Sequence, residues 1–243
     1  MSFLEITGVS QWFGGVTAVQ KVDFSVGKGE IVGLIGSNGA GKTTLFNIIG
    51  GYYRPSEGTV RFKGEDITGK KPFQICRKGI ARTFQVVRPL RNMTVLKNVM
   101  VGHLFGKDCM KAESQAQREA SKILEFVGLA GKRDLLAREL TLVDHKRLEV
   151  ARALACNPEL LLLDEVLAGL TPTEMAVAMD IVREAHRKMG LSILMVEHVM
   201  AAVVGLCSRV IVLHYGRKIA EGTPKEITEN PDVIEAYLGE SLA

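Results

Sequence analysis

A glycine-rich loop between a short apolar run and a helix-forming run constrains this chain more than any other feature. Residues 36–43 read GSNGAGKT, which matches the pattern G-x-x-x-x-G-K-[ST] of a phosphate-binding loop. The run at residues 30–35 is typical of a buried strand, and residues 44–49 favour a helix. Successive N–H groups of such a loop point inward at a phosphate, and the helix N-terminus adds free donors. The pattern therefore predicts a nucleoside triphosphate site, the alternative being a chance glycine-rich turn.

The loop also predicts which side chains contact the phosphates and a metal ion. Lys42 can reach the β- and γ-phosphates, and the Thr43 hydroxyl can ligate Mg²⁺. The residues expected to bind the nucleotide here are Gly36, Ser37, Asn38, Gly39, Ala40, Gly41, Lys42, Thr43 and Thr44.

A second motif, four leucines followed by two acids, supports this prediction. Residues 160–163 form an apolar run that suits a strand buried on both faces of a parallel sheet. Ligands in such folds bind at the carboxyl ends of the strands, where Asp164 and Glu165 emerge. Asp164 is placed to hold Mg²⁺, and Glu165 is placed as the general base for an attacking water. A solvated Asp-Glu loop is the alternative, but the phosphate-binding loop argues against it.

Composition sets limits on the class of protein. Hydrophobic residues make up 47% of the 243, enough for one large α/β domain or a core with an insertion. The net charge of +4 fits an anionic ligand or a membrane surface without requiring nucleic acid. No apolar run approaches the roughly 18 residues that span a bilayer, and no signal peptide is evident. We therefore expect a soluble cytoplasmic protein whose four cysteines are reduced thiols.

The order of strand and helix patterns predicts an α/β fold with two additions. Three early strand-like runs predict a small antiparallel sheet: residues 3–8, 22–26 and 59–63. Three later runs alternate with helical patterns, which indicates a parallel sheet with crossover helices: residues 160–163, 192–196 and 209–213. The block between about 85 and 157 lacks strand signals and contains two helical patterns, so it predicts an inserted helical subdomain. Helices are expected at residues 113–127, 141–155 and 231–238.

The further motifs follow an order that resembles the ATP-binding subunits of ABC transporters, over essentially the whole chain. Gln85, in the run RTFQ, matches the family's Q-loop glutamine, which contacts Mg²⁺ and the water and senses the membrane partner. His198, after a strand-like run, matches the switch histidine that hydrogen-bonds the γ-phosphate. Phe13, in the run WFGG, matches the aromatic residue that stacks on adenine, with Trp12 as the alternative. The run AGLT at residues 168–171 matches the D-loop, which crosses the dimer interface in this family.

The resemblance implies a P-loop NTPase (RecA-like) core with an antiparallel β subdomain and an inserted α-helical subdomain. Residues 1–84 and 158–243 would form the nucleotide-binding core with its β subdomain, and residues 85–157 the helical subdomain. The implied activity is ATP hydrolysis coupled to transmembrane transport, with ATP and Mg²⁺ as cofactors. The residues that would act in catalysis are Glu165, His198, Lys42 and Gln85. The residues that would ligate the metal ion are Thr43, Gln85 and Asp164.

Several short runs narrow the resemblance to the importer ATPase that serves branched-chain amino acids. They are RTFQ at 82–85, PLRNMTV at 89–95, AGL at 168–170 and VIEAYLG at 233–239. The ATPases of urea/amide importers and lipopolysaccharide exporters share parts of this pattern and are alternatives. The implied partners are a second ABC ATPase subunit, permease subunits and, indirectly, a periplasmic or extracellular solute-binding protein, but no nucleic acid. The implied location is peripheral, on the cytoplasmic face of the plasma (inner) membrane.

One segment departs from the family's pattern. The signature is normally LSGGQ, whereas residues 140–144 read LTLVD. Thr141 keeps a hydroxyl, but leucine and valine replace two glycines that allow close backbone approach to the γ-phosphate held by the other subunit. Asp144 puts a negative charge where a neutral glutamine is usual. We therefore hypothesise a heterodimer, in which this chain supplies an intact phosphate loop and a different chain supplies an intact signature.

Two rival classes follow from the same motifs. A non-hydrolysing regulatory nucleotide-binding subunit is favoured by the altered signature, whereas the intact Glu165 and His198 argue against it. A chromosome-maintenance or repair ATPase of related fold would carry long coiled-coil insertions, and no sustained heptads occur in this sequence.

Overall fold

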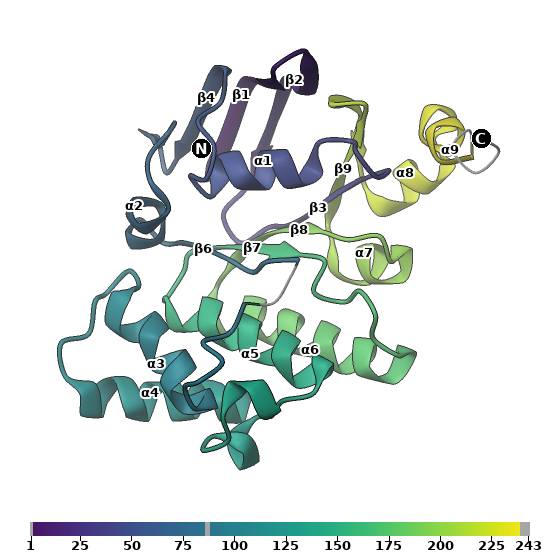
Figure 1. Cartoon of the computed structure of the whole chain (residues 1–243). Coiled ribbons are helices and arrows are strands. Elements are labelled where there is room, and N and C mark those ends of the chain that lie inside the picture. Colours follow the sequence, from purple (N-terminus) through teal and green to yellow (C-terminus); the bar gives the residue numbers. More distant parts are fainter. Residues whose placement is uncertain (1, 86–87, 239–243) are drawn as a thin grey trace. The chain divides into compact units, whose positions relative to one another are not determined.

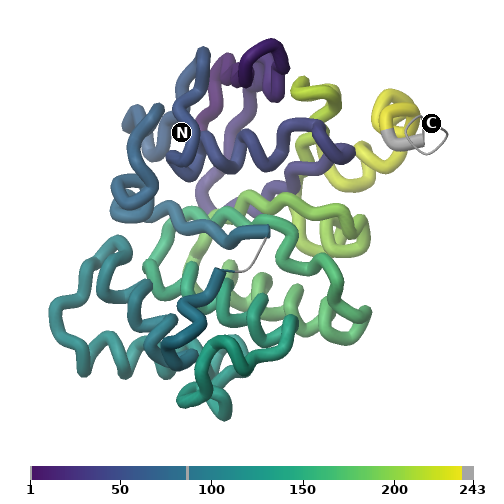
Figure 2. Tube along the Cα trace, viewed as in Figure 1, coloured from purple at the N-terminus to yellow at the C-terminus, as the bar shows by residue number. Residues whose placement is uncertain are grey.

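The computed structural model describes residues 2–85 and 88–238, and the chain divides into two units (Figure 1). The first unit joins Met1–Pro72 to Ser192–Ala243, and the second is Phe73–Leu191. The first unit therefore contains both ends of the chain, the purple and yellow stretches of the trace in Figure 2. Gly239, the last residue of the run VIEAYLG, lies outside the described residues.

An antiparallel sheet begins the first unit, as predicted. Its strand order is β2-β1-β4-β5. β1 pairs with β2 from Leu4 opposite Val26 to Phe13 opposite Val16, and three register shifts interrupt the pairing. The strands extend further than the three short runs that the sequence indicated. Their bounds are β1 (Leu4–Phe13), β2 (Val16–Val26), β4 (Glu57–Phe62) and β5 (Glu65–Asp66).

A second set of strands in the same unit is mainly parallel and carries the phosphate-binding loop. The order β10-β9-β3-β8 places β3 between two parallel neighbours, which confirms the predicted parallel sheet. Every residue of β3 and β8 is buried, because these strands form the core of the unit. The bounds are β3 (Ile31–Gly36), β8 (Ser192–Val196), β9 (Arg209–His214) and the antiparallel β10 (Arg217–Gly222). The helices are α1 (Lys42–Ile49), α7 (Met200–Leu206), α8 (Pro224–Glu229) and α9 (Pro231–Leu238).

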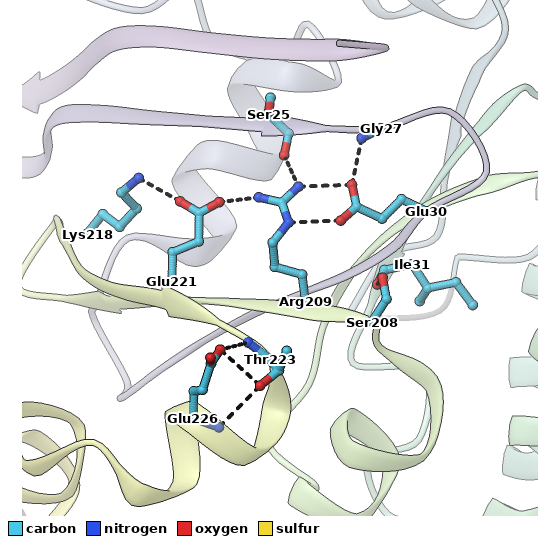
Figure 3. Close-up of polar contacts among 10 residues, drawn as sticks. All are labelled: Ser25, Gly27, Glu30, Ile31, Ser208, Arg209, Lys218, Glu221, Thr223 and Glu226. Atoms are coloured by element: carbon cyan, nitrogen blue, oxygen red, sulfur yellow. Dashed lines mark hydrogen bonds and ion pairs between the residues drawn. The ribbon is translucent and has the colours of Figure 1, made fainter. Parts of the chain in front are cut away.

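One arginine connects the strands of the two sheets in this unit (Figure 3). Arg209 on β9 forms two hydrogen bonds with Glu30, at 2.8 and 2.9 Å, and donates to the Ser25 carbonyl at 2.7 Å. It also pairs with Glu221 on β10, which accepts from Lys218 at 2.7 Å. The hydrogen bond from Arg209 outweighs burial and holds the pKa of Glu30 below its usual value. This network fixes the ends of β2, β3, β9 and β10 to one another.

The second unit combines a pair of parallel strands with helices. β6 (Ile80–Arg82) pairs with β7 (Leu160–Asp164), and all five residues of β7 are buried, as the leucine run predicts. The expected helices are present. In α4 the buried apolar residues lie on one face, and Gly128, at φ +75°, ends the helix. The helices are α2 (Pro72–Arg77), α3 (Val95–Phe105), α4 (Glu113–Phe126), α5 (Leu142–Ala155) and α6 (Pro172–Met189). Two short 3₁₀ turns, η1 (Ala130–Lys132) and η2 (Ala137–Glu139), precede α5.

Within residues 2–85 and 88–238, no helix is both long enough and apolar enough to cross a membrane.

Candidate functional site

The phosphate-binding loop of the first unit connects β3 to α1 and requires glycine at two positions. Gly36 has φ +152°, and a Cβ atom there would lie 2.2 Å from the Leu213 carbonyl oxygen. Gly41 has φ +99°, and its Cβ would lie 2.5 Å from the Ala18 carbonyl oxygen. Neither position has room for a side chain, so the loop is packed against β9 and β2 on its inner side. Asn38 and Gly39, at the tip of the loop, are exposed.

The side chain of Lys42 is fixed by hydrogen bonds to the backbone of its own loop. Its Nζ donates to the carbonyl oxygens of Gly36 at 2.5 Å and Ser37 at 2.7 Å, and the residue is only 5% exposed. The next residue, Thr43, is exposed, so its hydroxyl is accessible. An ammonium group and the backbone N–H groups at the start of a helix are the chemistry that a phosphate chain needs. These donors fit the triphosphate of ATP.

Two other predicted nucleotide contacts lie at the surface of the same unit. Phe13 ends β1, is 46% exposed, and meets Tyr53 edge to face with ring centroids 5.3 Å apart. The sequence did not indicate Tyr53 as its neighbour. His198 is exposed and follows β8, after the buried Glu197.

In the second unit, Asp164 ends β7 and is 1% exposed. Its Oδ2 accepts a hydrogen bond from Arg82 Nη2 at 2.7 Å, and its backbone N–H donates to the Thr83 hydroxyl at 2.9 Å. The Arg82 guanidinium also lies 5.2 Å from the centre of the Phe84 ring. Burying a carboxylate is costly unless a partner balances its charge, and Arg82 provides that balance. The sequence suggested the metal-binding role of Asp164 but not this arginine.

Glu165 and Gln85 are brought together by the structure. Gln85 Nε2 donates to Glu165 Oε2 at 2.8 Å, across 80 positions of sequence. Glu165 has φ +50°, a left-handed backbone that is uncommon for a residue other than glycine, asparagine or aspartate. Its carbonyl accepts a hydrogen bond from Lys146 Nζ on α5 at 3.1 Å. The turn thus directs the side chain of Glu165 toward Gln85.

The altered signature segment forms the N-terminus of α5. Thr141 caps the helix, because its hydroxyl accepts from the Asp144 N–H at 3.3 Å and donates to Asp144 Oδ2 at 2.7 Å. The same oxygen accepts from Lys132 Nζ at 2.5 Å. Burial opposes ionisation of Asp144, but the hydrogen bonds from Lys132 and Thr141 hold its pKa below the usual value. A carboxylate therefore lies at this helix end, where Leu142 is 57% exposed.

The oxygen donors named by the sequence suit the metal ion that it predicts. Mg²⁺ prefers hard oxygen ligands, and Thr43, Asp164 and Gln85 offer a hydroxyl, a carboxylate and an amide oxygen.

The structure adds two residues on α5 that contact the chain beside Gln85 and Glu165: Lys146 and Glu149, which the sequence analysis did not single out. Their signal was a three-residue spacing on a helix, which puts both side chains on one face.

Comparisons with known proteins identify the family that the chain matches. A family model for the ABC transporter matches residues 19–168, and one for the branched-chain amino acid ATP-binding cassette transporter matches residues 217–243. The chain is 40% identical over 250 residues to the high-affinity branched-chain amino acid transport ATP-binding protein LivG of Escherichia coli (strain K12), with 98% of each chain covered. It is 37% identical over 250 residues to BraF of Pseudomonas aeruginosa, which has the same descriptive name, again with 98% of each chain covered.

A solved structure is similar over nearly the whole chain. The crystal structure of a nucleotide-free ATP-binding cassette from an ABC transporter matches with a TM-score of 0.89 and 35% identity, covering 98% of this chain and 99% of the other. This likeness confirms the predicted P-loop NTPase fold. The chain belongs to the ABC transporter family, as the ATP-binding and ATP-hydrolysing subunit that powers an importer.

Proposed function

We propose that this chain drives the import of branched-chain amino acids. The proposal is supported by the names of its relatives and by the family match of residues 217–243. The chain would lie on the cytoplasmic face of the plasma membrane, bound to permease subunits, and a solute-binding protein would act on it through those subunits. A urea/amide importer and a lipopolysaccharide exporter are the alternatives.

The solute can be tested with the assembled transporter. The cassettes, permease subunits and solute-binding protein are reconstituted in liposomes, and ATP hydrolysis is measured with and without solute. Stimulation by leucine, isoleucine or valine is the expected result. Stimulation by urea alone would assign the chain to a urea/amide importer.

We infer the catalytic roles from the hydrogen bond between Gln85 and Glu165, the observation that carries the hydrolytic proposal. Glu165 would polarise the attacking water, and Gln85 would orient the Glu165 carboxylate and the water. Lys42 and His198 would stabilise negative charge on the γ-phosphate. Phe13 would stack on the adenine ring.

Thr43, Asp164 and Gln85 would hold Mg²⁺, which neutralises charge on the phosphates when it is bound. Arg82 supports this proposal, because its guanidinium balances the buried carboxylate of Asp164. The Asp164 carboxylate would thus be held in place for a cation.

We further propose that the second cassette of the transporter is a different chain. In this family the N-terminus of the signature helix contacts a phosphate held by the partner. Here the Asp144 carboxylate lies at that position, bonded to Thr141 and Lys132, and its charge opposes another anion. The exposed side chain of Leu142 also replaces a glycine that would allow close approach. A partner with an intact signature would complete one effective site around this chain's phosphate loop.

The asymmetry is tested by comparing two equivalent substitutions in the complete transporter. Glu165→Gln in this chain should nearly abolish ATP hydrolysis, whereas the corresponding change in the partner should cost less. Asp180→Asn, the same chemical change on the exposed face of α6, serves as the control. Equal losses from the two active-site changes would contradict the heterodimer proposal.

A further inference from the structure

We propose that Glu149 on α5 is a positioning residue that sets the place of Gln85 against Glu165. Glu149 Oε1 accepts a hydrogen bond from the Phe84 backbone N–H at 3.0 Å. Phe84 directly precedes Gln85, whose side chain donates to Glu165 at 2.8 Å. The inference rests on the proposed roles of Gln85 and Glu165, and it adds a residue that contacts neither of their reacting groups.

The same helix also holds the other side of this pair. Lys146 lies three residues before Glu149, so both side chains leave α5 on one face. Lys146 Nζ donates to the Glu165 carbonyl at 3.1 Å, where the backbone has its left-handed turn. One rigid turn of α5 therefore contacts the chain on both sides of the Gln85–Glu165 hydrogen bond. The helix, and not the loop alone, therefore sets the distance between the side chains of Gln85 and Glu165.

Burying the Glu149 carboxyl at this point destabilises the folded chain. It is 5% exposed, and burial raises its pKa to about 7 despite the Phe84 N–H and the positive charges of Arg152 and Lys146. The nearby charge of Asp164 raises the pKa further. The residues before and after it in α5, Leu148 and Val150, are buried and apolar. What an apolar side chain could not do is accept the Phe84 N–H.

Loss of this acceptor should be visible in turnover. A displacement of about 1 Å of a catalytic group can cost on the order of 100-fold in rate. Nucleotide affinity should change less than turnover, because Gln85 is one of three residues proposed to hold Mg²⁺, and the phosphate-binding loop and Lys42 belong to the first unit. A kcat effect that is much larger than any KM effect is therefore the expected result of losing the Glu149 contact.

The experiment measures kcat and KM for MgATP in the complete transporter with substituted forms of this chain. Glu149→Leu removes the acceptor, and Glu149→Gln keeps an oxygen acceptor without the charge. Val150→Ala is the control for weakened packing of α5, since Val150 is a buried neighbour outside the hydrogen bonds described. Gln85→Ala and its combination with Glu149→Leu complete a double-mutant cycle. Turnover is expressed per nucleotide-binding site, so that a fraction of unfolded chain does not count as lost activity.

We expect Glu149→Leu to lower kcat by roughly tenfold to a hundredfold with little change in KM. Glu149→Gln should restore turnover to within about threefold of the unmodified chain, because its amide oxygen can accept the Phe84 N–H. The double variant should be no slower than the slower single variant, because Glu149 is proposed to act only through the position of Gln85.

Three outcomes would overturn the inference. They are normal turnover of Glu149→Leu, equal losses in Glu149→Leu and Glu149→Gln, and multiplying losses in the double variant. Failure of the proposed catalytic roles would look different: Gln85→Ala and Glu165→Gln would then be active by themselves.

Discussion

Replacing Glu149 by glutamine should make the stability of the nucleotide-free protein depend less on pH. Glu149 is almost fully buried on α5, and burial raises its pKa from 4.5 to about 7. Below pH 4.5 the group is protonated in both the folded and the unfolded chain. Between pH 4.5 and 7 the unfolded chain releases the proton first, which favours unfolding. Above pH 7 the folded protein has released it too, and the full penalty is present.

The size of the effect follows from the two pKa values. Each pH unit between 4.5 and about 7 corresponds to about 1.4 kcal/mol, so the penalty reaches about 3 kcal/mol at pH 8. The glutamine side chain that Glu149→Gln introduces does not titrate, so the variant escapes this penalty. The difference in free energy of unfolding between Glu149→Gln and the unmodified protein should therefore increase by about 3 kcal/mol from pH 4.5 to 8 and then level off.

Urea unfolding of the isolated full-length chain, followed by circular dichroism at several pH values, measures this difference. Glu184→Gln on α6 is the control, because hydrogen bonds from Lys188 and Arg187 hold the pKa of that exposed carboxyl below its usual value. Its removal should produce a small change of opposite sign. A free-energy difference for Glu149→Gln that stays constant with pH would refute the reasoning, since it would mean that Glu149 titrates alike in the folded and unfolded chain.

Three further predictions concern other parts of the molecule. Arg209→Met should lower the free energy of unfolding by roughly 1–3 kcal/mol in urea, because Glu30 loses two hydrogen bonds, whereas Arg183→Met at an exposed pair should change it by less than about 0.5 kcal/mol. Gly36→Ala should abolish binding of a fluorescent ATP analogue, because the added Cβ would lie 2.2 Å from a carbonyl oxygen. Gly131→Ala is the control, because a Cβ added there would meet nothing within 4 Å. Unchanged affinity of Gly36→Ala would contradict the loop geometry. Lys132→Met should lower the free energy of unfolding at pH 7 by up to about 1 kcal/mol, because Lys132 stabilises the ionised Asp144. The loss should shrink as the pH falls toward 3 and Asp144 becomes protonated. A loss that persists at pH 3 would argue for packing instead.

The sequence predicted the fold wherever a single segment carried its own pattern. The leucine run of β7 and the apolar strands β3 and β8 are examples, because burial on both faces leaves a continuous apolar signal. The full length of β1 could not be predicted, since register shifts after Ile6 and Val9 interrupt the alternation of its residues. β6 has three residues, and β10 has no buried residue, so each is defined by pairing with its neighbour rather than by its own sequence.

The same distinction applies to the candidate site. The leucine run with its two acids pointed to Asp164 and Glu165, and the family resemblance pointed to Gln85; the roles of all three stay predictions. Arg82 and Glu149 could not be found in this way, because their partners lie 82 and 65 positions away in the sequence. Such residues act through contacts that only the folded chain creates. The sequence shows only a charged residue among apolar ones and, for Glu149, the three-residue spacing from Lys146, and neither identifies the partner.

The position of Lys42 has a consequence for nucleotide recognition. A lysine side chain has about 2 kcal/mol of rotamer entropy to lose when it is immobilised. Here folding has already immobilised it, because its ammonium group is bonded to two carbonyl oxygens of its own loop. Under the proposed role of Lys42, an arriving nucleotide would meet a charge that is already held in place. The lysine would then bind phosphate without this entropy loss, and its charge would favour the triphosphate over the diphosphate.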